Sequence, residues 1–207
     1  MIVYDNLKRR IITNGLKPGD PLNEGTLSKE LKTSKTPIRE ALQQLEKEGL
    51  VENIPGKGAF VSRFSFQDVR ELCEIRDILE CEVIKRVACK ADLNLAEAQA
   101  IREKFISSNT NGGKTGRSYF SEGEQIHSFI FSAYGNRKLM REYQGLQEQI
   151  LRISLHFFGQ NRQERAAASF KEHLAIIDAL IARDPVLAER TMRIHIQNSL
   201  EYLKSVI

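Results

Sequence analysis

The stretch that decides the fold runs from residue 27 to residue 51 and reads LSKELKTSKTPIREALQQLEKEGLV. Thr36 offers a hydroxyl that can cap a helix, and Pro37 has the preset φ of a first helical residue. A helix is therefore expected from there to about Glu48, where Gly49 stops it. Its apolar positions recur at helical spacing, at Ile38, Ala41, Leu42 and Leu45.

Upstream of this helix the sequence predicts two more. The first begins at the N-terminus, with apolar positions at Val3, Leu7, Ile11 and Ile12, and ends at Gly15. The second is short, is capped by Asn23, and ends at about Leu31, before a turn at residues 32–35.

Downstream, residues 50–54 and 59–61 read as two strands joined by the glycine-rich turn 55–58. Three helices and a two-stranded wing make a winged helix-turn-helix. A new helix begins at the capping-box pattern of residues 65–68. We therefore place a DNA-binding domain at residues 1–64 and a second domain at 65–207.

The second domain is expected to be an all-α helical bundle. After a helix to about residue 90, helical spacing continues over about 94–106, 118–134, 136–157, 162–182 and 185–205. Asp184 before Pro185 is a typical start for the last helix. The fold class is thus mainly α, with the wing as its strand content.

Composition narrows the class of protein. Residues 1–64 hold eleven Lys and Arg against eight Asp and Glu, whereas the remainder is nearly neutral. This modest basic excess fits DNA binding. The three cysteines contain no C-x-x-C pair, and no apolar run approaches the length of a membrane helix. A cytoplasmic protein without a membrane partner is expected.

The 27–51 stretch, followed by the wing GKGAFV at residues 56–61, resembles the DNA-binding domain of the GntR family of bacterial transcription regulators. The resemblance implies that the positions matching Lys35, Thr36, Arg39 and Gly58 contact DNA, and Lys57 lies beside them in the wing. An arginine can bind guanine O6 and N7 together, whereas lysine and threonine hold phosphates. An alternative role for Arg39 is an i,i+4 pair with Gln43 on a solvated helix face.

Two positions depart from the family pattern. The family usually has arginine where Lys35 stands, and often a DNA-contacting arginine where this chain has Gly25. Both changes weaken bidentate readout, so a shifted operator sequence or a lower affinity is expected.

The second domain resembles the all-helical effector domain, FCD, of the family's FadR-type branch. The resemblance rests on His127 before Gly135-Asn136, on Glu172-His173, and on Met192 before His195. It implies a divalent metal held by the three histidines and an aspartate, but the aspartate position is Gly123 here. Imidazoles suit Zn²⁺ or Ni²⁺, and Glu124 is a candidate fourth ligand. The alternative is three polar core histidines without metal; His156 matches no motif and is expected to be structural.

A metal of this kind suits a small organic acid, because a carboxylate can replace metal-bound water while an arginine binds its other oxygen. Arg76 resembles the pocket-facing arginine of the family, and Arg152 is a second candidate. The alternative for Arg76 is an i,i+4 pair with Glu80 on the helix surface.

These residues predict a homodimeric repressor that binds a pseudo-palindromic operator and is released by a small carboxylate. Two other classes of protein are alternatives. A metal-dependent hydrolase would use the histidines to activate water, but the sequence has no nucleophile motif and no phosphate loop. A structural DNA-binding protein would have no effector. We expect a regulator and not an enzyme.

Overall fold

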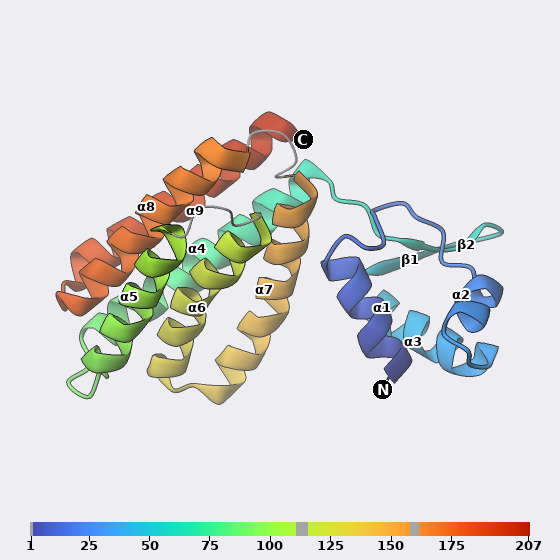
Figure 1. Ribbon diagram of the computed structural model, residues 1–207, viewed down its shortest axis with the longest axis horizontal. Coiled ribbons are helices and arrows are strands. Elements are labelled where there is room, and N and C mark those ends of the chain that lie inside the picture. The colour runs from blue at the N-terminus through green and yellow to red at the C-terminus, as the bar shows by residue number, and fades with distance from the viewer. Residues whose placement is uncertain (1, 111–115, 158–161) are drawn as a thin grey trace. The chain divides into compact units, whose positions relative to one another are not determined.

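The computed structural model describes the backbone of residues 2–110, 116–157 and 162–207, and side chains apart from those of 109–122 and 158–163. Over these residues the chain forms two compact units, Met1–Ser65 with Leu151–His156, and Phe66–Ile150 with Phe157–Ile207. The elements, labelled in Figure 1, are α1 (Ile2–Ile12), α2 (Glu24–Glu30), α3 (Lys35–Lys47), β1 (Val51–Ile54), β2 (Gly58–Val61), α4 (Phe66–Ala88), α5 (Leu95–Thr110), α6 (Gly116–Tyr134), α7 (Arg137–Phe157), α8 (Arg162–Ile181) and α9 (Pro185–Val206).

The N-terminal unit is a winged helix-turn-helix, as predicted. Strands β1 and β2 pair antiparallel, with Val51 opposite Val61 and Ile54 opposite Gly58. Gly56 in the connecting turn and Gly58 have positive φ angles of 75° and 96°, a conformation that glycine adopts without strain. The apolar faces of the three helices meet the inner face of this wing in one core, which contains Leu7, Ile11, Leu22, Leu27, Ile38, Leu45, Leu50, Val51 and Val61.

The starts of α2 and α3 differ in one respect from prediction. The Asn23 side chain caps α2 by accepting hydrogen bonds from the N–H groups of Gly25 and Thr26, as expected. Helix α3, however, begins at Lys35 with Ser34 as its cap residue, so the predicted cap at Thr36 is wrong. Pro37 is tolerated as the third helical residue, because the first four N–H groups of a helix have no intrahelical partner.

The C-terminal unit is the predicted helical bundle, and its described residues contain helices and no strand. Helix α9 packs along α4 and α8, and α8 also contacts α5 and α6. Figure 1 shows α4, α6, α8 and α9 running side by side through this unit. The Asp184 side chain caps α9 by accepting hydrogen bonds from the N–H groups of Val186 and Leu187.

A membrane-spanning role finds no support in the described part of the chain, where every helix is too short or too polar to cross a bilayer.

Candidate functional site

A groove of about 510 Å³ lies on the N-terminal unit, between the start of α2, the outer side of α3 and the wing. Its lining includes four of the five predicted DNA-binding residues: Lys35, Arg39, Lys57 and Gly58. The fifth, Thr36, is exposed in the first turn of α3. We call this the reading groove. The lining also contains Glu24 and Glu46, so the groove presents three basic and two acidic side chains. Its lysines and arginine suit contact with a nucleic-acid backbone and base edges.

Arg39 makes an ion pair that sequence reasoning missed. Its Nε donates to Glu24 Oε1 at 3.0 Å and its Nη2 donates to Glu24 Oε2 at 2.9 Å. The predicted alternative partner was Gln43, one helical turn away, whereas Glu24 belongs to α2. The hydrogen bonds from Arg39 lower the pKa of Glu24, so the carboxylate is ionised at neutral pH. No helical spacing rule finds a pair fifteen residues apart.

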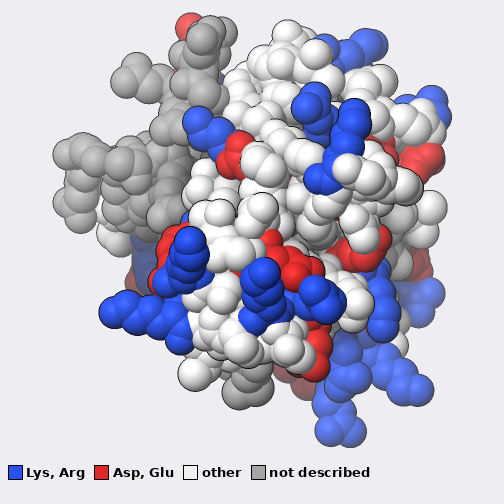
Figure 2. Space-filling model, turned by 90° about the vertical axis from the view of Figure 1, so that its right-hand side faces the viewer, with Lys and Arg blue, Asp and Glu red and all other residues white. Residues whose placement is uncertain are grey.

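Acidic side chains accompany the basic ones elsewhere too. On the face drawn in Figure 2, some Lys and Arg side chains gather together, whereas others have acidic side chains beside them. Residues 1–64 hold eleven Lys and Arg against eight Asp and Glu, so long-range attraction to DNA is modest and local contacts in the reading groove matter more.

In the C-terminal unit, His127 of α6, His173 of α8 and His195 of α9 meet in a buried cluster. The candidate ligand atoms of the three histidines all lie within 4.8 Å of one another. Among the described residues this group contains neither Glu124 nor another carboxylate. Sequence reasoning thus chose three residues that the fold does bring together, although they lie up to 68 positions apart.

Each of these histidines has its Nδ1 atom fixed by an acceptor. His127 Nδ1 lies 2.7 Å from Glu80 Oε2, and His195 Nδ1 lies 2.8 Å from Glu172 Oε2. His173 Nδ1 lies 2.7 Å from the main-chain oxygen of Ser169. A carboxylate or a carbonyl oxygen can only accept, so these three contacts favour the tautomer with the proton on Nδ1.

In a neutral ring with its proton on Nδ1, the Nε2 atom carries the lone pair. His127 Nε2 and His173 Nε2 are 3.2 Å apart. At this distance either one ring donates an Nε2–H group to the other, or a cation lies between two lone pairs. Metal-binding histidines commonly donate the second ring N–H to a carboxylate or a main-chain oxygen in this way, because that partner sets the tautomer and the ring orientation.

Burial favours the neutral form that a metal ligand needs. Desolvation lowers the pKa of His173 well below its usual range, and the neighbouring histidines lower it further. Desolvation lowers the pKa of His195 to about 4, although Glu172 opposes the shift. Burial raises the pKa of Glu172, but hydrogen bonds from His195 and Arg165 outweigh it and bring the value to about 2.

Gly123 and Glu124 lie one turn before His127 on α6. A Cβ atom added to Gly123 would lie 2.7 Å from His173 Nε2, so the imidazole occupies the space that a side chain would need. Glu124 is mostly buried, and desolvation raises its pKa to about 7. A role for Glu124 as a fourth ligand stays a prediction.

Arg76 makes its predicted alternative pair with Glu80, but inside the protein and not on a helix surface. Arg76 Nε donates to Glu80 Oε1 at 2.7 Å, and both side chains are buried. Burial raises the pKa of Glu80, but Arg76 and His127 together hold it well below its usual range. Burial raises the pKa of Tyr143, and the Glu80 carboxylate raises it further. Glu80, which sequence reasoning treated only as a surface partner, thus connects Arg76 to His127.

A similar arrangement serves the third histidine. Arg165 makes two hydrogen bonds to Glu172, with Nη1 to Oε1 at 2.8 Å and Nη2 to Oε2 at 3.0 Å. Two of the three histidines therefore rest on a carboxylate that an arginine holds ionised. Glu172 directly precedes His173 in the sequence, and this position in the motif is what could have identified it as part of the site.

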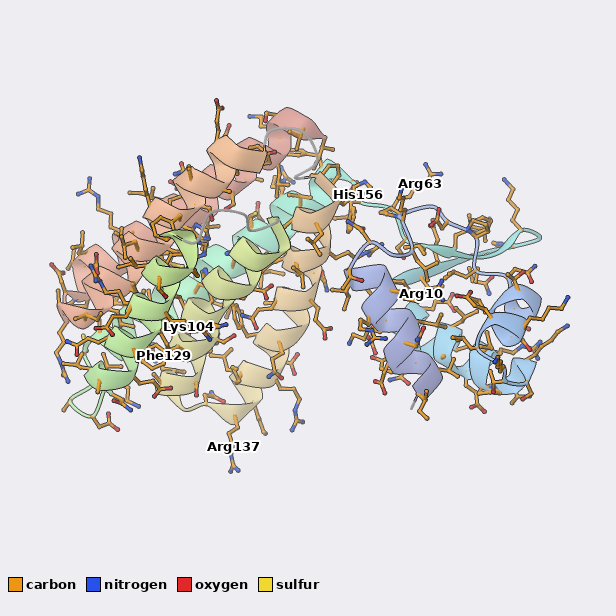
Figure 3. The ribbon with its side chains drawn as sticks, viewed as in Figure 1. Arg10, Arg63, Lys104, Phe129, Arg137 and His156 are labelled. Carbon is orange, nitrogen blue, oxygen red and sulfur yellow. The ribbon has the colours of Figure 1, made fainter. Side chains whose placement is uncertain are left out.

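Arg152 and His156 lie in the segment of α7 that groups with the N-terminal unit. Arg152 donates a hydrogen bond to the Ser62 carbonyl, and its guanidinium is 4.3 Å from the centre of the Phe64 ring. Burial lowers the pKa of Arg152 to about 10. His156, labelled in Figure 3, lies with its ring 5.7 Å from the same phenylalanine. An effector-binding role for Arg152 stays a prediction.

Two protein-family models match the chain. The model for bacterial regulatory proteins of the gntR family matches residues 2–61, and the FCD domain model matches residues 71–198. Both domains that the sequence suggested are therefore present. The FCD match contains the three histidines, and the gntR match contains the reading groove.

Curated relatives cover nearly the whole chain. It is 29% identical over 210 residues to the uncharacterized HTH-type transcriptional regulator YdhC of Bacillus subtilis, covering 99% of this chain and 90% of that protein. It is 25% identical over 213 residues to the HTH-type transcriptional repressor RspR of Escherichia coli, with coverages of 99% and 88%. A probable D-xylose utilization operon repressor of Paenarthrobacter nicotinovorans is 30% identical over 196 residues, with coverages of 94% and 84%.

Solved structures show the same fold. A putative transcriptional regulator GntR from Rhodococcus matches with a TM-score of 0.79 at 20% identity, covering 99% of this chain and 97% of that one. E. coli McbR/YncC matches with a TM-score of 0.73 at 21% identity, covering 98% and 95%. With these matches, the chain belongs to the GntR family, in the branch with an FCD domain, and is a DNA-binding transcription regulator and not an enzyme.

Proposed function

We propose that this regulator is a homodimeric repressor that binds a pseudo-palindromic operator and leaves it when a small carboxylate binds at a metal ion in the C-terminal unit. Repression is supported by the names of two relatives, RspR and the D-xylose operon repressor. A dimer places two winged helices on successive half-sites, which the two-fold symmetry of such operators requires. Light scattering of the purified chain is expected to give about twice its 23.6 kDa mass.

The convergence of ring nitrogens from three buried histidines, all within 4.8 Å of one another, supports the metal assignment. Two nitrogens bound to one tetrahedral Zn²⁺ at about 2.0–2.1 Å are about 3.3 Å apart. The His127 and His173 Nε2 atoms are 3.2 Å apart. The donor set fits Zn²⁺ or Ni²⁺, which prefer imidazole over the oxygen ligands of Mg²⁺ or Ca²⁺.

The charges around the cluster support an acidic effector. Glu80 is paired with Arg76, and Glu172 with Arg165, so each carboxylate beside the histidines is already balanced by a guanidinium. A divalent ion on three neutral imidazoles would retain its positive charge. When bound, such an ion supplies an attractive site for an anionic oxygen. Arg76, buried beside the cluster, is the side chain we assign to the second oxygen of that carboxylate.

Ligand binding would act on DNA through the dimer. A ligand shifts an equilibrium only by its differential affinity for the two states. We propose that the carboxylate prefers a dimer geometry in which the two reading heads no longer match successive half-sites. The reading groove contributes Lys35 and Lys57 to phosphates and Arg39 to a guanine edge in the DNA-bound geometry.

Metal analysis tests the assignment directly. Untagged protein, purified without added metal, is measured by inductively coupled plasma mass spectrometry as wild type, His173→Ala and His156→Ala. We expect near-stoichiometric zinc or nickel in the wild type and in His156→Ala, whose histidine lies outside the cluster, and loss of the metal in His173→Ala. Equal metal content in all three proteins, or none in the wild type after dialysis against zinc, would contradict the metal site.

A further inference from the structure

Glu24 holds the guanidinium of Arg39 in one orientation within the reading groove. Both residues line this groove, and the Arg39 side chain remains 61% exposed despite the ion pair. An arginine on an exposed helix face normally samples many rotamers. Two parallel hydrogen bonds from one carboxylate fix the plane of the guanidinium as well as its position.

The pair leaves a specific set of donors available. Glu24 accepts from Nε and from one N–H of Nη2. Both N–H groups of Nη1 and the second N–H of Nη2 are not used by this pair. These donors lie at the end of the guanidinium away from the carboxylate, in the arrangement that binds guanine O6 and N7 together. The ion pair therefore orients Arg39 without blocking its bidentate edge.

We infer that Glu24 is a specificity-determining positioning residue, which fixes Arg39 for guanine at the expense of general attraction to DNA. The inference rests on the proposed contact between Arg39 and guanine. A carboxylate beside the groove repels phosphates, so it lowers affinity for DNA of any sequence. A fixed guanidinium loses more than a mobile one when guanine is replaced, because it cannot turn to another acceptor. Gly25 has no side chain that could contact a base, so base recognition by this groove depends more strongly on Arg39.

The chain offers a matched control for this charge. Glu30 lies on the same helix as Glu24, and it pairs with Arg10 of α1, the residue labelled in Figure 3, at 2.9 Å. Glu30 does not belong to the lining of the groove. Glu30→Gln therefore removes the same charge from the same helix and leaves the Arg39 pair intact.

The test uses selection from a random duplex DNA library with the full chain, as wild type, Arg39→Ala, Glu24→Gln and Glu30→Gln. The base preference that Arg39→Ala abolishes identifies the position read by Arg39. At that position we expect Glu24→Gln to reduce discrimination roughly two- to fivefold, the size typical of an exposed charge pair, while Glu30→Gln leaves it unchanged. Affinity of Glu24→Gln for a duplex without the selected motif is expected to rise.

Two outcomes would overturn the inference, and only the second would also overturn the proposed contact between Arg39 and guanine. If Arg39→Ala removes a base preference and Glu24→Gln keeps it at wild-type strength, Glu24 does not position Arg39, and the proposed function stands. If Arg39→Ala leaves the selected motif unchanged, the guanine contact itself is wrong, and the role of Glu24 fails with it. Thermal melts of all four proteins show whether each variant is folded.

Discussion

At the scale of single residues, the histidine cluster depends on a glycine, because Gly123 leaves the space that the His173 ring occupies. Gly123 is a helical glycine of α6, and a Cβ atom there would approach His173 Nε2 to 2.7 Å. Gly145 is also helical, on α7, but a Cβ there would meet no atom within 4 Å. The two glycines therefore separate the general effect of replacing glycine in a helix from the effect of filling the cluster.

Gly123→Ala is expected to destabilise the protein and weaken zinc binding. Alanine favours a helix by about 1 kcal/mol over glycine, which both variants gain. Only Gly123→Ala pushes an imidazole off its position, at a cost of roughly 1–3 kcal/mol. Urea unfolding and zinc titration of both variants measure this. Gly145→Ala is expected to be as stable as wild type or more so. If Gly123→Ala matches it in stability and zinc affinity, the close approach is not real.

Glu124 makes the stability of the metal-free protein depend on pH. Its pKa is raised from 4.5 to about 7 by burial. The folded state then holds a proton that the unfolded state releases, so stability falls as pH rises from about 4.5 to 7. Glu124→Gln removes this loss and is expected to stabilise the chelated protein by about 3 kcal/mol at pH 8, and hardly at pH 4.5.

Denaturant unfolding of both proteins at the two pH values, with chelator present, measures the effect of Glu124. Equal stability differences at both pH values would show that the carboxyl titrates normally. The same variants also test the predicted fourth ligand, because Glu124→Gln lowers zinc affinity only if Glu124 coordinates the ion.

At the scale of elements, the cap residues of α2 and α3 differ in what they contribute. Asn23 accepts hydrogen bonds from two N–H groups of α2, whereas the Ser34 side chain makes no capping hydrogen bond to α3. Asn23→Ala is expected to cost about 1 kcal/mol, and Ser34→Ala close to nothing. Hydrogen exchange of the full chain, followed by mass spectrometry over residues 24–47, measures each loss. Equal loss of protection in the two variants would contradict the capping assignment.

The elements themselves follow closely from the sequence, and their exact ends do not. Helix α7 was predicted at about 136–157 and is Arg137–Phe157, because its apolar positions keep one period throughout. Helix α3 was misplaced at its start because proline was assigned to the first helical position, although any position in the first turn accepts it. A cap signal limits a boundary to within a turn and does not fix its residue.

The sequence predicts the histidines of the site but not all of the residues that contact them. The three histidines belong to family motifs, and they meet as predicted. Glu80 reaches His127 only because α4 packs against α6, a contact that no motif contains. Glu24 similarly reaches Arg39 through the turn between two helices. Ser169, by contrast, lies one turn before His173 on α8, so helical spacing alone could have found that contact. Contacts between elements depend on their packing, which periodicity along one element does not contain.

At the scale of the whole molecule, the two units are expected to unfold as separate cooperative blocks, because each has its own core. A ligand that binds only the folded state stabilises the unit that holds it, by about 2.7 kcal/mol at a free concentration one hundred times its Kd. The histidine cluster lies in the C-terminal unit. Zinc should therefore raise the unfolding temperature of that unit and move the other much less.

Differential scanning calorimetry of the full chain, with zinc and with chelator, measures both transitions at once. The N-terminal transition is expected to stay nearly in place, because zinc binds only the folded C-terminal unit. His173→Ala is the control, and zinc should leave both of its transitions in place. If zinc shifts the transitions of His173→Ala as much as those of the wild type, the ion binds elsewhere. If zinc shifts both wild-type transitions equally, the two units do not unfold separately. The ion would then stabilise the reading groove directly through shared cooperative unfolding.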